Sequence, residues 1–139
     1  MLRRKTRIMT VKFQPDRLEG VNAISRHEAS RLWVNAIEWT SSVLVPARGE
    51  PQAWPVGRLS ELTADHFARL LSLDPELVVF GSGARLRFVT PALLRPLIER
   101  GIGVETMDTV AACRTFNVLA SEGRAVAAAL LIEPAAPSE

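Results

Sequence analysis

The sequence predicts an α/β protein in which a mixed sheet is flanked by helices. Residues 77–132 alternate apolar strand signals with helix signals in the order β-α-β-α-β, joined by short connections. Adjacent parallel strands need such crossovers, which are almost always right-handed. Residues 31–45 supply a hairpin signal, so both antiparallel and parallel pairing are expected. At 139 residues, the chain is long enough for one domain with a substantial core.

The hairpin signal is the segment RLWVNAIEWTSSVLV (31–45), which is rich in β-branched and aromatic residues. Asn35-Ala36 interrupts it as a plausible turn, so we expect strands at about 31–34 and 38–45. The next segment, PARGEPQAWPVG (46–57), contains three prolines and two glycines. Because proline cannot donate to a sheet ladder, this segment is expected to be a loop or an irregular edge.

The second half begins with a helix that Thr63 caps and that runs to about Ser72. Another helix starts at Thr90-Pro91 and stops at Gly101, and Pro96 predicts a kink or a late start within it. The remaining elements are strands at 77–80, 102–107 and 124–132, and a helix that Asp108 or Thr109 caps, which runs to about Ser121 with Gly123 as its stop.

Charge is unevenly distributed along the chain. The formal net charge is +2, but residues 1–12 hold five basic residues and no acid. The rest therefore has 12 basic and 15 acidic residues, a net of −3. We expect residues 1–9 to form a disordered basic arm, 10–133 a single domain and 134–139 a disordered tail. Nucleic-acid binding is not expected, because only the arm favours it.

A cytoplasmic location is expected from three features. Cys113 is the single cysteine, which excludes an internal disulfide and fits a reducing compartment. The longest clean apolar run, residues 125–132, is far shorter than the roughly 20 residues of a transmembrane helix. The first residues, MLRRKTRI, lack the apolar core of a secretory signal, and Met9 is an alternative start.

The sequence offers no recognisable catalytic set. His27 and His66 have no metal-ligand spacing, so no metal or other cofactor is expected, and both are interpreted as surface residues. Ser82 lacks the glycines, two positions before and after it, that a hydrolase elbow requires. Cys113 lies on a predicted helix and is interpreted as a small buried hydrophobic residue. The sequence therefore leaves enzyme activity open and favours a protein without it.

Gly81-Ser82-Gly83 follows an apolar strand, where α/β proteins often hold a phosphate. The segment lacks both the lysine of a Walker A loop and the third glycine of a dinucleotide fingerprint. A tight strand exit is the favoured interpretation. Arg85 and Arg87 leave an alternative, because two guanidinium groups beside glycine amides suit a phosphate or a carboxylate.

The helix predicted at 109–121 carries a second polar signal. Arg114, Asn117 and Ser121 share one stripe, with Thr115 beside it. A polar stripe usually faces solvent. Thr115 and Asn117, however, are poor helix formers that nothing local requires in the middle of a helix.

These segments together resemble the Mth-type domain family. This family includes uncharacterised bacterial and archaeal proteins, a vertebrate adipogenesis-associated protein and mitochondrial complex I assembly factor 3. The resemblance covers about residues 10–133, including VNAISR, VVFGSG and GIGVETM. Its most specific part is a helix motif followed by Glu-Gly-Arg, which falls on Thr109, Ala112, Thr115, Phe116, Asn117 and Glu122-Gly123-Arg124.

The resemblance implies a three-layer α/β fold with a smaller β element alongside, and no established enzyme activity. Pro96 departs from the family pattern. We expect a non-catalytic binding or assembly protein with a protein partner, and Trp33, Trp39 and Trp54 are candidates either for that contact or for core packing. The alternative is a small-anion-binding protein or an enzyme whose site gathers Gly81, Ser82, Gly83, Arg85, Met107, Thr109, Arg114, Thr115 and Asn117.

Overall fold

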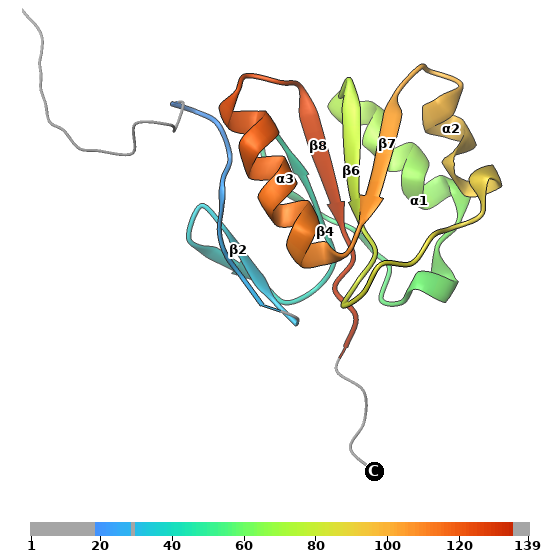
Figure 1. The fold of residues 1–139 in the computed structure, drawn as a ribbon, viewed down its shortest axis with the longest axis horizontal. Helices are drawn as coiled ribbons and strands as arrows, with labels where there is room; N and C mark the ends of the chain where they lie inside the picture. Colours follow the sequence, from blue (N-terminus) through green and yellow to red (C-terminus); the bar gives the residue numbers. More distant parts are fainter. Residues whose placement is uncertain (1–18, 29, 135–139) are drawn as a thin grey trace, which may run out of the picture.

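The computed structural model of the chain describes residues 19–28 and 30–134. It contains a five-stranded sheet in the order β5-β4-β8-β6-β7 and a three-stranded sheet in the order β1-β2-β3 (Figure 1). The predicted arm at 1–9, and all of the predicted tail except Pro134, lie outside the described residues. Within those residues, no helix combines the length and the apolar character needed to cross a membrane.

The five-stranded sheet is mixed, as the sequence predicts. β6 pairs with β7 and β8 in parallel, whereas β4 pairs antiparallel with β8 and β5. In this register, Gly81 at the end of β6 is level with Met107 on one side and Leu130 on the other. The strands are β4 (Val43–Pro46), β5 (Gln52–Ala53), β6 (Leu77–Gly81), β7 (Gly103–Met107) and β8 (Val126–Leu130).

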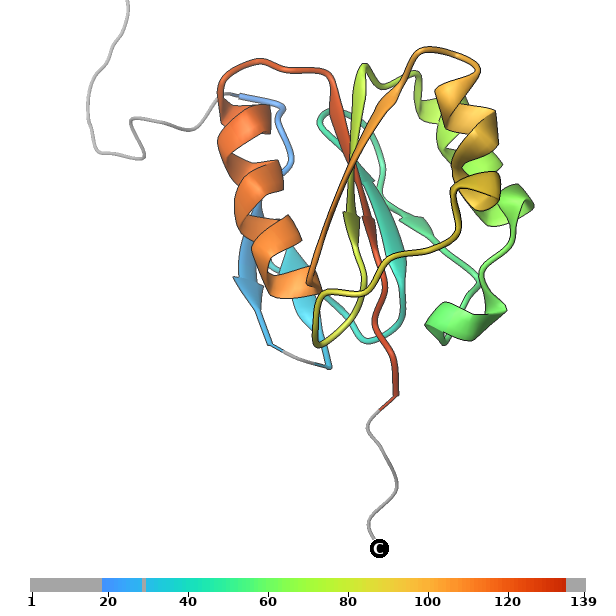
Figure 2. The same cartoon turned by 45° about the vertical axis from the view of Figure 1, so that its right-hand side comes forward.

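Helices cover both faces of this sheet (Figures 1 and 2). One face packs against α3 (Thr109–Ser121), and the small sheet extends the same core cluster. The other face packs against α1 (Ala64–Ala68) and α2 (Arg95–Ile98). This second core is built around the edge-to-face rings of Trp54, Phe67 and Phe80.

The first half contains more strands than the sequence predicts. The strand expected at 38–45 is two strands: β3 (Ile37–Trp39) belongs to the small sheet and β4 to the large one. Between β3 and β4, the hydroxyl of buried Ser42 accepts a hydrogen bond from the Ile132 amide at 2.8 Å. This bond connects the segment between the two sheets to the residues that follow β8. The 46–57 segment contains the short edge strand β5.

The predicted turn at Asn35-Ala36 is confirmed, with φ values of 51° and 75°. Two consecutive left-handed residues suit a two-residue hairpin between β2 (Leu32–Val34) and β3. The partner strand β1 (Ile24–His27) was not predicted, because ISRH carries a weak apolar alternation. Its pairing with β2 completes the small sheet.

The predicted helix at 63–72 is α1 followed by the 3-10 turn η2 (Arg69–Leu73). Thr63 caps it as expected. His66 is not simply a surface residue, because its Nδ1 accepts from the Thr63 amide at 3.0 Å and its Nε2 lies 3.1 Å from the Pro55 carbonyl.

Pro96 produces a late start of the predicted helix at 90–101. A 3-10 turn, η3 (Pro91–Leu94), precedes α2, and Pro96 lies in the first turn of α2.

Candidate functional site

The end of β6 touches the beginning of α3 at Gly81. A Cβ atom added to Gly81 would lie 2.9 Å from Thr109 Cα and 3.1 Å from Ala112 Cβ. The 2.9 Å distance to a backbone atom is shorter than a real Cβ atom allows, so a glycine at this position permits the close helix–strand packing. The predicted Gly-Ser-Gly turn therefore begins at a residue whose size is limited by its contact with α3.

Thr109 binds this turn through both its backbone and its side chain. The Gly83 amide donates to Thr109 Oγ1 at 2.9 Å, and the Thr109 amide donates back to the Gly83 carbonyl at 2.8 Å. Thr109 Oγ1 donates in turn to the Leu131 carbonyl at 2.8 Å. One buried hydroxyl thus links the exits of β6 and β8 to the first turn of α3.

Ser82 is also committed to internal bonds. Its amide donates to the Met107 carbonyl at 2.8 Å. Its hydroxyl donates to the Arg85 carbonyl at 2.8 Å and accepts from the Arg87 amide at 2.9 Å. The Ser82 and Gly83 amides that a phosphate cradle would offer are both directed at protein oxygens.

The turn already holds an anion, which is the carboxylate of Glu133. Arg87 Nη2 lies 2.6 Å from Glu133 Oε1 and 2.6 Å from the Ser82 carbonyl. Glu133 Oε2 accepts from the Leu59 amide at 2.9 Å. The glycine at 83 makes room for this pair, because a Cβ there would lie 3.0 Å from Glu133 Oε1. Gly83 also has a φ of 106°, which disfavours other residues.

Two further polar groups near this end of the sheet, Asp108 and Cys113, have structural environments. Asp108 caps α3 by accepting from the Ala111 amide at 2.8 Å. Cys113 is buried, and burial, with a smaller contribution from the Asp108 charge, raises the pKa of its thiol to about 12. A thiol with that pKa is a poor nucleophile at neutral pH. Among the described residues, no three His, Cys, Asp or Glu side chains are grouped to hold a metal ion.

The structure brings together only part of the predicted site. Gly81, Ser82, Gly83, Met107 and Thr109 meet at the ends of β6 and β7. The side chains of Arg85 and Arg114 are exposed, and Thr115 is half-buried on α3.

Asn117 lies two turns along α3 and faces the small sheet. Its Oδ1 accepts from the Ile24 amide at 2.8 Å and its Nδ2 donates to the Ile24 carbonyl at 2.9 Å. The side-chain amide therefore acts as a backbone partner for β1. This explains why a poor helix former stands in the middle of the helix.

Sequence reasoning missed an apolar surface on the loop that follows the turn, residues 84–90, which we call the exit loop. Leu86 and Phe88 are 52% and 71% exposed. Arg87, between them, turns inwards to Glu133, and Val89 packs against the core around Trp54. The alternation in Arg-Leu-Arg-Phe was a usable signal, but its usual interpretation buries the apolar residues rather than the arginine.

The tryptophans have different environments. Trp54 is buried, and its Nε1 donates to the His66 carbonyl at 2.9 Å, so it is a core residue. Trp39 is half-buried and packs against the core on the α3 side. Trp33 is half-buried beneath the guanidinium groups of Arg26 and Arg31, which lie 4.7 and 5.3 Å from its ring centre.

Comparison with known proteins places these features in a family. The family described as "Protein of unknown function (DUF498/DUF598)" matches residues 24–131. NADH dehydrogenase (ubiquinone) 1 alpha subcomplex assembly factor 3 from Bos taurus is 43% identical over 83 residues, which are 58% of this chain and 45% of the bovine protein. The Danio rerio protein of the same name is 40% identical over 103 residues, or 73% of this chain and 58% of that one. The chain thus aligns with about half the length of these curated relatives.

Solved structures show the same fold. A crystal structure of a Bordetella parapertussis protein has a TM-score of 0.78 at 35% identity and covers 82% of this chain and 98% of its own. A solution structure of a Bordetella pertussis protein, described as a Mth938-like domain, has a TM-score of 0.77 at 28% identity and covers 90% and 93%. The three-layer fold and the small additional β element implied by the resemblance are therefore confirmed.

The contact at Gly81 predicts a strong effect of a single methyl group. Gly81→Ala should lower the free energy of unfolding by about 1–3 kcal/mol, because the methyl group overpacks the β6–α3 contact. Denaturant titration followed by circular dichroism measures this change.

Gly103→Ala on β7 is the matched control, since its added Cβ would make an ordinary 3.5 Å contact with Leu77. That variant should stay within about 0.5 kcal/mol of the unmodified protein. Equal effects of the two substitutions would show that the contact at Gly81 is not specifically constrained.

The contact of Asn117 with β1 predicts that substituting this residue lowers the stability of the fold. Asn117→Ala should lower the free energy of unfolding by about 1–3 kcal/mol, because both backbone groups of Ile24 lose their partner. Ser121→Ala, on the same helix, removes a bond to the helix's own Val118 carbonyl and should change stability by less than about 0.5 kcal/mol. A neutral Asn117→Ala variant would contradict this role.

Proposed function

The chain belongs to the DUF498/DUF598 family, and on this premise we propose that it is a non-catalytic assembly protein that binds a partner protein through its exit loop. The observation that carries the proposal is that Leu86 and Phe88 are exposed on a loop whose Arg87 and Val89 are directed inwards. Aromatic and arginine side chains are enriched at the centres of protein interfaces, and Arg85 is exposed beside this pair.

The internal contacts of the exit loop support docking. The internal bonds of Ser82 and Arg87 hold its first half, and Val89 anchors its second half in the core. A preorganised loop loses little conformational entropy on binding, so more of the contact energy appears as affinity. Exposing two large apolar side chains on a fixed loop costs solvation free energy that an apolar partner surface would recover.

The relatives suggest the kind of partner. Those of known role carry the name of an assembly factor for NADH dehydrogenase, so the proposed partner is a subunit of a respiratory NADH dehydrogenase or another assembly factor for it. This chain aligns with only about half of those proteins, and the proposal concerns the shared domain.

Anion binding at the turn is the second candidate. It is favoured by Arg87 Nε, which is buried and has no hydrogen-bond partner in the described part of the chain. Against it, an incoming phosphate would have to displace Glu133 from Arg87 and release the Ser82 and Gly83 amides from their present acceptors. Asn117 would join such a site only by giving up its bonds to Ile24 of β1.

A double substitution tests the docking proposal. Leu86→Ala with Phe88→Ala should weaken partner binding about thirtyfold or more, because truncating a central aromatic residue typically costs about 2 kcal/mol or more. The measurement is complementation in cells lacking the gene. Assembled NADH dehydrogenase is quantified on native gels, and proteins that co-purify with the tagged chain are identified by mass spectrometry.

Val118→Ala is the control, because Val118 is 55% exposed on α3 rather than on the exit loop. Val118→Ala should restore assembly as the unmodified chain does, whereas the double variant should not. Full complementation by the double variant would overturn the exit loop as the docking surface. Normal NADH dehydrogenase levels in cells without the gene would overturn the proposed partner.

A further inference from the structure

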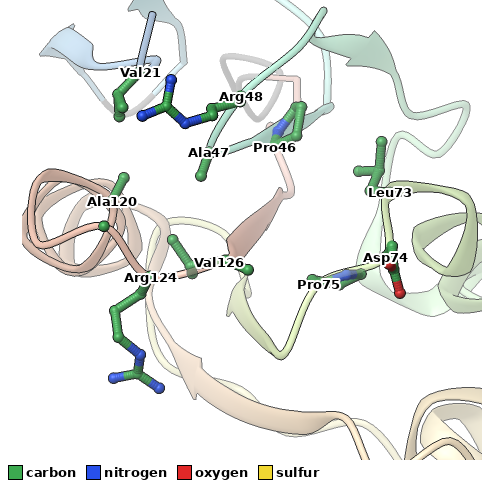
Figure 3. A pocket seen from close by; sticks show the side chains of 12 residues that line it. Val21, Pro46, Ala47, Arg48, Leu73, Asp74, Pro75, Ala120, Arg124 and Val126 are labelled. Carbon is green, nitrogen blue, oxygen red and sulfur yellow. The ribbon is translucent and has the colours of Figure 1, made fainter. Parts of the chain in front are cut away.

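A hollow of about 220 Å³ (Figure 3) is lined by residues at the end of the sheet opposite to the Gly-Ser-Gly turn. It opens between the amino ends of β6 and β8, the C-terminal end of α3 and the segment that follows β4. Its apolar lining includes Val21, Ala47, Leu73, Ala120 and Val126.

One wall of the hollow is fixed by Asn22, a buried polar residue. Asn22 Nδ2 donates to the carbonyls of Pro46 and Gly49, each at 2.8 Å, and these two residues bracket Ala47 and Arg48. The Asn22 amide also donates to the Ala47 carbonyl at 2.8 Å, and the Ala47 amide donates to the Val126 carbonyl at 2.9 Å. The segment carrying Arg48 is therefore held in a defined position rather than left as a free surface loop.

Arg48 is positioned at the rim of this hollow. Its Nη1 donates to the Glu19 carbonyl at 3.2 Å. Gly20 allows this approach, because a Cβ at position 20 would lie 3.0 Å from the same nitrogen. Figure 3 shows the Arg48 side chain on the same side of the hollow as Val21 and Ala47. A guanidinium group has five N–H donors, so the bond to Glu19 leaves it with donors for a ligand.

The charged groups around the hollow leave one guanidinium group, that of Arg48, without a carboxylate partner among the described residues. The described lining of the hollow carries Arg48 and Arg124 and a single carboxylate, Asp74. Arg124 pairs with Glu76 at 3.2 Å, so Arg48 is the main candidate to meet a ligand. At the end of α3, the carbonyls of Val118, Leu119 and Ala120 already accept from the amides of residues 122–124.

We infer that this hollow binds a small carboxylate with a short aliphatic chain, with the carboxylate on Arg48 and the chain against the apolar floor. The hollow is smaller than the roughly 300–1,000 Å³ of pockets for drug-sized ligands, which limits the chain to a few carbons. A planar guanidinium group suits a carboxylate because it can donate two parallel hydrogen bonds. This site is separate from the exit loop and does not depend on the proposed docking function.

A chain-length series tests the apolar half of the site. The full-length protein is titrated with acetate, butyrate and hexanoate while amide chemical shifts are recorded by NMR. Each buried methylene contributes about 0.8 kcal/mol, so hexanoate, with two more methylenes, should bind about fifteenfold more tightly than butyrate. The shifts should concentrate on residues 47–48 and 123–126. Equal affinities along the series, or shifts centred elsewhere, would overturn the inference.

Two variants test the charged half and the position of the site. Arg48→Gln should weaken hexanoate binding about threefold or more while leaving binding of neutral hexanol unchanged. Arg114→Gln removes an exposed arginine from α3 outside the hollow and should leave hexanoate binding unchanged. Ala47→Leu, which fills the hollow without altering charge, should abolish binding of both compounds. Unchanged hexanoate affinity in Arg48→Gln or Ala47→Leu would contradict the inference.

Discussion

The hydroxyl of Thr109 is the interaction on which the arrangement of this fold most depends. It accepts from Gly83 and donates to Leu131, and so joins two parallel strand exits to the start of α3 within a buried site. The contact is possible only because Gly81 has no side chain to hold the helix away from the sheet. Loss of the hydroxyl would leave a buried amide and a buried carbonyl without partners, which costs more than the bonds themselves contribute.

The bonds that close the Gly-Ser-Gly turn also limit which ligands this end of the sheet could bind. The Ser82 and Gly83 amides face protein acceptors, and Glu133 neutralises Arg87, so the turn resembles a phosphate site whose anion is part of the chain. Beyond this closed turn, Arg87 of the exit loop is directed inwards, whereas Leu86 and Phe88 are exposed. The exposed Leu86 and Phe88 of the proposed docking surface therefore lie on either side of an arginine that is used inside the protein. At the opposite end of the sheet, Asn22 fixes the segment around Arg48 in a comparable way, but there the lining leaves a hollow.

The sequence predicts the second half of this fold well, because β6 and β8 are continuous apolar runs and α1 and α3 carry clear caps. It predicts the first half less well. Polar Thr40-Ser41-Ser42 looks like part of one strand, and only tertiary contacts show that Ser42 bonds to Ile132 and separates two sheets. The same limit applies to the site. Asn117 is recognisable from sequence as anomalous, but its partner Ile24 lies 93 positions away, and the pairing of Arg87 with Glu133 spans 46.

Amide hydrogen exchange at Gly83, with and without inorganic phosphate, tests the central claim that the turn is closed by Thr109. We predict that this amide exchanges as slowly as the central amides of β6, because it is buried and bonded to Thr109 Oγ1. We also predict that millimolar phosphate leaves its rate unchanged. Fast exchange at Gly83 that phosphate slows would contradict the account, because it would show that the turn is an open anion cradle.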